Sequence, residues 1–222
     1  MTEGRLLVPL YVHPAEDPAA WQALTRVPSL LYGVVLNVAD GPGATRDPAF
    51  AAVAGALRAV GVRVLGYLDS AYGTRPHQLV IEELRRHINW YGIDGVFLDQ
   101  AGAEADLLPY YRALAEEARG HGAGPVVFNP GTHPDPGYAA VADLLVTFEG
   151  DWPTYLTAAV PSWTAEYPPT RFCHLVHGVP DSLCDLAAGT ARTRRAEVHC
   201  AVPGGGANPW AALPPAVRRG TT

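Results

Sequence analysis

The chain has 222 residues, of which 48% are hydrophobic and 17% charged, and its net charge of −6 argues against the basic stripe of a general nucleic-acid binder. This length lies within the range of one α/β barrel, and the composition lacks the low hydropathy and high net charge of a disordered protein. All 16 basic residues are arginine, so mechanisms that require a lysine, such as Schiff-base chemistry, are excluded.

The start of the chain and its cysteines predict a cytoplasmic protein, with a secreted one as the alternative if a leader precedes this sequence. A signal peptide needs a basic first segment, a longer apolar run than Leu6–Val12 and a cleavage site of small residues. No run approaches the ~18 apolar residues of a membrane span. The three cysteines lack framework spacing, which fits reduced thiols. We expect a small-molecule or oligosaccharide substrate as partner, no nucleic acid and no membrane.

Short apolar runs recur along the chain, and most are continuous rather than alternating, which is typical of parallel strands buried on both faces. They lie at residues 6–12, 33–38, 62–68, 95–99, 125–129, 144–148, 172–177 and 196–202. Helical spacing predicts clear helices after the second, third and fourth runs, the first of them opened by the N-cap pair Asp47-Pro48. Shorter helix candidates lie near residues 136–141, 153–160 and 209–217.

Strand–helix units that follow one another without a linker predict one (β/α)8 TIM-type barrel with short loops. We expect this single domain to cover residues 1–222, with about 216–222 as a frayed tail. A doubly wound open sheet is the alternative. Its dinucleotide-binding form has no support, because no Gly-x-Gly-x-x-Gly follows the first strand.

Polar side chains end strand after strand, where barrel enzymes carry their chemistry. They are Tyr11, His13, Asn37, Tyr67, Asp69, Asp99, Gln100, Asn129, Glu149, His177 and Cys200. A purely structural rim would also be polar. Asn37 and Asn129 are as consistent with turn capping as with substrate contacts. Asp94 begins its strand instead, so we expect it to cap the floor of the barrel.

Asp99 and Glu149 stand apart because each closes a strongly apolar run. A half-desolvated carboxylate needs a partner, a metal or a reaction to offset its burial. A structural ion pair is one interpretation. The other is a catalytic pair facing one another across the barrel mouth, as glycosidic cleavage requires. Carboxyl groups about 5–5.5 Å apart would indicate a retaining mechanism, and about 6.5–9.5 Å an inverting one.

Aromatic residues near these strand ends could stack on sugar faces. Tyr11, Tyr67 and Tyr72 are candidates, and Trp152, three residues beyond Glu149, is the better tryptophan platform. Trp90 lies on a helical stripe and is expected in the core.

Metal and phosphate chemistry receive less support, and we predict no cofactor. The thiols and imidazoles of two neighbouring strands are Cys173, His174, His177, His199 and Cys200. Strand alternation places Cys173 and His177 on one face and His174 on the other, so ordinary core residues are the simpler interpretation. The glycines at 204–206 lie where many barrels bind phosphate, but no lysine is available there.

Six segments follow one another in the order found in a known family. They are Val8-Pro9-Leu10-Tyr11, Leu36-Asn37-Val38-Ala39-Asp40-Gly41-Pro42-Gly43, Gly66-Tyr67-Leu68-Asp69-Ser70-Ala71-Tyr72-Gly73, Trp90-Tyr91-Gly92-Ile93-Asp94-Gly95-Val96-Phe97-Leu98-Asp99, Phe128-Asn129-Pro130-Gly131 and Phe148-Glu149. Over residues 8–150 the chain therefore resembles the spherulation-specific family 4 (spherulin-like) proteins. Beyond residue 150 only residues 174–178 follow the family.

The resemblance implies a barrel glycoside hydrolase similar to enzymes that cut α-1,4-linked galactosamine polymers without a metal. The Asp of the family's Phe-Phe-Asp-Glu motif falls on Asp99, which implies a nucleophile or transition-state carboxylate. A later family acid falls on Glu149, which implies the general acid/base.

One position departs from the family: the second acid of the motif is Gln100 here. Being neutral and an amide donor, Gln100 is expected to hold Asp99 ionised and to leave Glu149 as the proton carrier. The alternatives are an enzyme of specialised metabolism that uses the carboxylates for cyclisation, elimination or isomerisation of a small molecule, and a catalytically silent sugar-binding protein.

Overall fold

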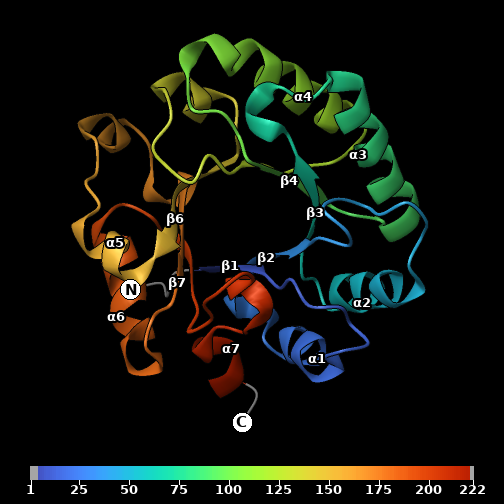
Figure 1. Cartoon of the computed structure of the whole chain (residues 1–222), viewed down its shortest axis with the longest axis horizontal. Helices are drawn as coiled ribbons and strands as arrows, with labels where there is room; N and C mark the ends of the chain where they lie inside the picture. Colours follow the sequence, from blue (N-terminus) through green and yellow to red (C-terminus); the bar gives the residue numbers. More distant parts are fainter. Residues whose placement is uncertain (1–4, 221–222) are drawn as a thin grey trace.

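Eight parallel strands close into a barrel in the order of the sequence, and helices surround it (Figure 1). The computed structural model describes residues 5–220. The strands are β1 (Arg5–Pro9), β2 (Leu31–Leu36), β3 (Val64–Asp69), β4 (Gly95–Asp99), β5 (Val126–Phe128), β6 (Leu144–Asp151), β7 (Phe172–His177) and β8 (Val198–Ala201). Since β8 pairs with β1, the sheet has no free edge, and the alternative of an open doubly wound sheet is wrong.

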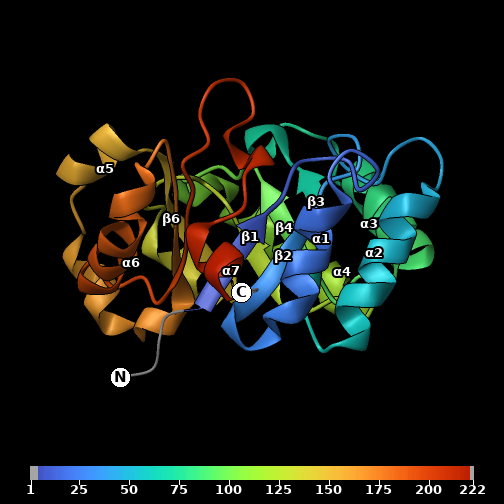
Figure 2. The same ribbon diagram turned by 90° about the horizontal axis from the view of Figure 1, so that it is seen from below.

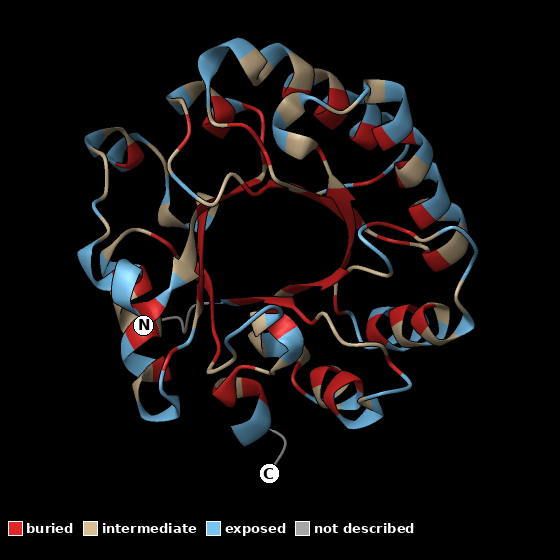
Figure 3. Cartoon of the chain, viewed as in Figure 1, coloured by how far each residue is buried: buried red, intermediate tan, exposed pale blue. Residues whose placement is uncertain are grey.

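Both faces of the strands are buried, as the continuous apolar runs predicted (Figure 3). Inward-facing side chains such as Leu7, Val35 and Phe97 fill the barrel. Outward-facing ones such as Val8, Leu36 and Leu98 pack against the helices. This period-two division determines which residues at the strand ends can face the barrel axis.

Within residues 5–220 the outer layer is built from seven α-helices of unequal length. They are α1 (Pro18–Arg26), α2 (Pro48–Ala59), α3 (His77–Tyr91), α4 (Leu108–Gly120), α5 (Trp152–Thr157), α6 (Cys184–Thr193) and α7 (Pro215–Arg219). The Asp47 side chain accepts hydrogen bonds from the amides of Ala49 and Phe50, so the predicted N-cap of α2 is confirmed. After β5 the layer thins to a 3-10 helix at Pro136–Ala140.

Two expected boundaries are corrected by the structure. The chain does not fray from residue 216, because α7 continues to Arg219 and Val217 is fully buried; residues 221–222 of the expected tail lie outside the described residues. Strand β6 does not end before Glu149 but runs on to Asp151, paired with β7. A register shift between Val146 and Phe148 allows this extension and leaves Glu149 within the strand.

The two ends of the barrel differ. The loop that follows β8, drawn in red, projects from one end in Figure 2, the end at which the strands finish. At the other end Asp94 precedes β4, accepts a hydrogen bond from the amide of Val64 and pairs with Arg58, so its predicted place at the floor is confirmed. Within residues 5–220, no helix combines the length and the apolar character that a membrane crossing requires.

Candidate functional site

Asp99 and Glu149 meet through one side chain at the carboxyl ends of the strands. The amide nitrogen of Asn129 donates to Asp99 Oδ1 at 2.6 Å and to Glu149 Oε2 at 2.5 Å. These two carboxylate oxygens are therefore no more than about 5.1 Å apart, the sum of the two hydrogen bonds. The pair approaches across β5, which lies between β4 and β6.

Asn129 is held in the orientation that serves both carboxylates. Its Oδ1 accepts a hydrogen bond from the amide of Gly131, which identifies the other terminal atom as the nitrogen. The side chain is 4% exposed, and the amide of Glu149 donates to the Gly131 carbonyl. The loop after β5 thus fixes both the bridging amide and the backbone of the second carboxylate.

Tyr67 and Tyr11 cover the Asp99 side of the site. The Tyr67 hydroxyl donates to Asp99 Oδ2 at 2.8 Å, and the Tyr11 ring packs edge-on against Tyr67, with centroids 5.9 Å apart. Burial and the negative charge of Asp99 raise the pKa of both phenols above their ordinary range, so both hydroxyls stay protonated.

Trp210 contacts Glu149 from the loop after β8, a contact that sequence reasoning missed. Its indole nitrogen donates to Glu149 Oε1 at 3.0 Å. The Trp210 carbonyl accepts from the amide of Tyr11, and the His177 ring lies edge-on to the indole, with centroids 5.9 Å apart. The only sequence signal was a tryptophan shortly after the glycines at 204–206.

Burial raises the pKa of both carboxyl groups, and the other groups that act on each pKa differ. For Asp99, hydrogen bonds from the Tyr67 hydroxyl, the Gln100 amide of the backbone and Asn129 act against the burial. For Glu149, the charge of Asp99 raises the pKa further, against the hydrogen bonds from Asn129 and Trp210. The charge of Asp99 thus adds to the effect of burial on the pKa of Glu149, whereas three hydrogen bonds act against the effect of burial on the pKa of Asp99.

Gln100 acts on Asp99 through its backbone. Within residues 5–220 its side-chain amide makes no hydrogen bond, so the expected contact from that amide to Asp99 is not present, whereas its main-chain N–H lowers the pKa of Asp99. Gln100, Ala71 and Tyr72 all have left-handed backbone conformations, with φ of 46°, 44° and 54°. Such strain, about 1–3 kcal/mol per residue, clusters at functional sites.

Three predicted binding residues have structural partners. Asn37 Oδ1 accepts from the amide of Gly41, and Asp69 Oδ1 from that of Ala71, so both shape loops at the mouth. Trp152 is 8% exposed and packs against Tyr155 outside the barrel, where its ring offers no open face to a sugar. Tyr72, by contrast, is 60% exposed.

The core histidines and thiols are separated as strand alternation predicted. Cys173 and Cys200 point into the barrel, whereas His174 faces outward and bonds the Tyr155 hydroxyl at 2.8 Å. In the part of the chain that the structure describes, no group of three or more His, Cys, Asp or Glu side chains is arranged to hold a metal ion.

Open space adjoins the carboxylate pair on one side. A pocket of about 320 Å³ lies between the loop after β5, strand β6 and the residues that follow α5. Glu149, Phe148 and His133 are among its lining residues. Glu149 therefore borders both the barrel mouth and this side pocket.

The fold and these side chains define a TIM-type barrel with a bridged carboxylate pair at its mouth. The family model "Spherulation-specific family 4" matches residues 5–204, and the chain belongs to this family. Spherulin-4 of Physarum polycephalum is 33% identical over 150 residues, which cover 65% of this chain and 44% of that protein. The chain thus matches less than half the length of this relative.

Two solved structures show the same architecture. Aspergillus clavatus Sph3 in complex with GalNAc superposes with a TM-score of 0.83 at 26% identity, over 99% of this chain and 98% of that one. Deoxyribose phosphate aldolase from Aeropyrum pernix has a TM-score of 0.55 at 12% identity, over 90% of this chain and 86% of that one, which is a likeness of fold alone. The likeness to Sph3 supports a sugar-binding or hydrolase-like role.

Proposed function

We propose that the protein hydrolyses amino-sugar glycosides, with Asp99 and Glu149 as its catalytic pair. The observation that carries this proposal is the Asn129 bridge, which keeps the two carboxylate oxygens within about 5.1 Å. This upper limit lies well below the about 6.5–9.5 Å of inverting glycosidases, so the spacing favours a retaining mechanism. The GalNAc bound by Sph3 supports an amino sugar as the substrate class.

In the first step Asp99 attacks the anomeric carbon as the glycosidic bond breaks, and Glu149 gives its proton to the leaving oxygen. In the second step Glu149 takes a proton from water, which attacks the anomeric carbon and releases Asp99. Burial and the neighbouring charge raise the pKa of Glu149, which suits it to carry that proton.

The surrounding donors support both steps. When Glu149 has delivered its proton, the N–H groups of Asn129 and Trp210 stabilise the new carboxylate. The Tyr67 hydroxyl and the Asn129 amide each hold one oxygen of Asp99, so the carboxylate keeps a fixed orientation at the mouth. Tyr11, Tyr72 and His177 are the proposed sugar contacts at the rim.

The test is the release of reducing ends from α-1,4-linked galactosamine and N-acetylgalactosamine oligomers. Asp99→Asn and Glu149→Gln each lower kcat at least about a hundredfold, as expected when a general acid or nucleophile is lost. Asp106→Asn is the control, since this carboxylate is exposed on the loop after β4. Undiminished cleavage by either catalytic variant would overturn the assignment.

Gln100 favours a second candidate function. Because the family motif has an acid at this position, its neutral replacement is consistent with acid–base chemistry on a small molecule, or with sugar binding without turnover. Intact protein that binds GalNAc but cleaves no oligomer supports the binding role. Turnover of a non-glycosidic compound that is lost in Asp99→Asn supports the other enzyme.

A further inference from the structure

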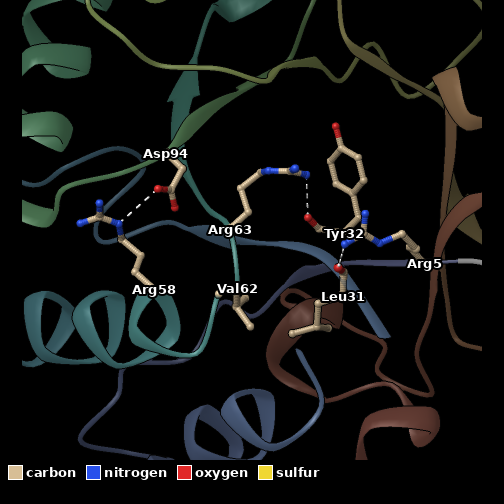
Figure 4. A pocket seen from close by; sticks show the side chains of 8 residues that line it. Arg5, Leu31, Tyr32, Arg58, Val62, Arg63 and Asp94 are labelled. Atoms are coloured by element: carbon tan, nitrogen blue, oxygen red, sulfur yellow. Dashed lines mark hydrogen bonds and ion pairs between the residues drawn. The ribbon is translucent and has the colours of Figure 1, made fainter. Parts of the chain in front are cut away.

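A second pocket lies at the floor of the barrel, at the opposite end from the carboxylate pair (Figure 4). Its volume is about 310 Å³, and its walls come from the start of β1, the start of β2, the end of α2 and the segment before β3. Three arginines line it, Arg5, Arg58 and Arg63, together with Tyr32 and Asp94. It is a basic site in a chain whose net charge is −6.

The pocket carries two positive charges that pair with no carboxylate of the described residues. Arg58 Nε pairs with Asp94 Oδ1 at 3.2 Å, which neutralises one guanidinium. Among residues 5–220, no carboxylate lies within 4.0 Å of the guanidinium nitrogens of Arg5 or Arg63. The local excess of charge therefore matches a doubly charged anion.

The two unbalanced guanidinium groups are held in place by uncharged partners. Arg63 Nη1 donates to the Tyr32 carbonyl at 3.0 Å, and Arg5 Nη2 to the Leu31 carbonyl at 2.7 Å. Figure 4 shows the Tyr32 side chain beside both arginines. The centroid of its ring lies 4.9 Å from the Arg63 guanidinium carbon and 6.0 Å from that of Arg5. Each guanidinium group uses one of its five N–H donors for its carbonyl, so the other donors of this planar group are available to a ligand.

We propose that this floor pocket binds a doubly charged tetrahedral oxyanion, a phosphate or sulfate group, either free or as an ester of a small molecule. Arginine forks donate in pairs to such oxygens, and each of these two guanidinium groups is already anchored to a carbonyl at the pocket wall. The proposal is independent of glycoside hydrolysis, because the site shares no residue with the carboxylate pair.

The test is an NMR titration of the intact protein with sodium sulfate, inorganic phosphate and glycerol 3-phosphate, with sodium chloride at equal ionic strength as the reference. We expect saturable shifts of the Arg5 and Arg63 side-chain signals and of the amides near Tyr32. Saturation by inorganic ions identifies a free oxyanion site, and saturation by the ester alone identifies an organic phosphate. Shifts that never saturate, or that chloride reproduces, would overturn the proposal.

Variants assign the site to its residues. Arg63→Gln and Arg5→Gln should each weaken binding about tenfold or more, since a charge-assisted hydrogen bond is lost. Arg63→Lys should weaken it too, because it keeps the charge without the fork. The matched control is Arg46→Gln, an arginine that also donates to one carbonyl, that of Trp90, but lies outside the pocket. Equal loss in the control would show a general effect of net charge and contradict the site.

Discussion

The amide group of Asn129 donates one hydrogen to Asp99 and the other to Glu149, so a single neutral side chain determines how close the two carboxylates can lie. An amide bridge holds the two carboxyl groups close together and carries no charge of its own. The sequence left Asn129 open between turn capping and substrate contact. Its oxygen does cap the turn at Gly131, while its nitrogen serves the carboxylates.

Trp210 should lower the pKa of the proposed general acid, Glu149. Trp210→Phe removes a donor from the ionised form of Glu149, and losing such a donor raises a carboxyl pKa. We expect the alkaline limb of the kcat/KM profile to move upward by about one pH unit, the equivalent of one hydrogen bond to a charged group. The measurement is the pH dependence of oligomer cleavage. Trp163→Phe is the control and should leave the alkaline limb in place. An alkaline limb that does not move in Trp210→Phe would contradict an effect of Trp210 on the pKa of Glu149.

The variant Gln100→Glu tests whether the replacement of the family's second acid by Gln100 changed the function of the site. Gln100→Glu places a negative charge next to Asp99, and like-charge repulsion raises the carboxyl pKa values. We expect this variant to cleave α-1,4-linked galactosamine oligomers faster than the natural chain. Reducing-end assays of both forms decide the matter. Equal rates would mean that position 100 contributes little to turnover.

At the scale of single elements, strand packing at the floor depends on Gly95, the first residue of β4. A Cβ there would lie 2.3 Å from the Pro125 carbonyl oxygen, so backbone would have to move. Gly95→Ala should lower the free energy of unfolding by about 1–3 kcal/mol, as overpacking does.

Gly55 supplies the matched control for that substitution. It lies within α2, where an added Cβ would meet nothing within 4 Å. Gly55→Ala should raise the free energy of unfolding by about 0.5–1 kcal/mol, because alanine is the better helix former. Denaturant titrations measure both. Two changes of the same sign would contradict the packing argument.

Local patterns in β6 predicted its apolar half but not its full length. The run from Leu144 to Phe148 signalled a strand, whereas its extension through Glu149 to Asp151 depends on pairing with β7. The register shift near Thr147 is a property of two strands together. For the same reason the orientation of Glu149 became clear only in the closed sheet.

For the whole molecule, buried histidines make stability fall in mild acid. Burial lowers the pKa of His87 and His199 to about 4 and of His174 to about 3. Unfolded histidine titrates near pH ~6.5, so between that pH and about 4 the unfolded chain binds more protons than the folded one. Stability is therefore full above pH ~6.5 and is lost progressively as the pH falls toward 4.

His87→Gln should weaken this dependence. Glutamine retains a donor for the Tyr67 carbonyl, which His87 contacts at 2.8 Å, but does not titrate. The slope of unfolding free energy against pH between 6.5 and 4.5 should decrease by up to about 1.4 kcal/mol per pH unit, the equivalent of one proton. The exposed His121→Gln serves as control, and a slope unchanged in His87→Gln would contradict the assignment.

Much of the architecture was determined by the sequence itself, since continuous apolar runs separated by helical patterns leave few folds besides a parallel barrel. The same alternation separated inward Cys173 from outward His174. The apolar runs also marked Asp99 and Glu149, because each of these carboxylates closes such a run, and this signal is local to each strand.

The tertiary structure alone decided which side chains meet. Glu149 and Trp210 come together because β8 closes against β1 and its following loop passes over the mouth, a contact between residues far apart in the chain. Trp152 lies near Glu149 in sequence, yet it begins helix α5 and packs against Tyr155 in the layer outside the barrel. Sequence spacing sets the face of a strand on which a residue lies, whereas the approach of two strands depends on the closure, tilt and register of the whole barrel.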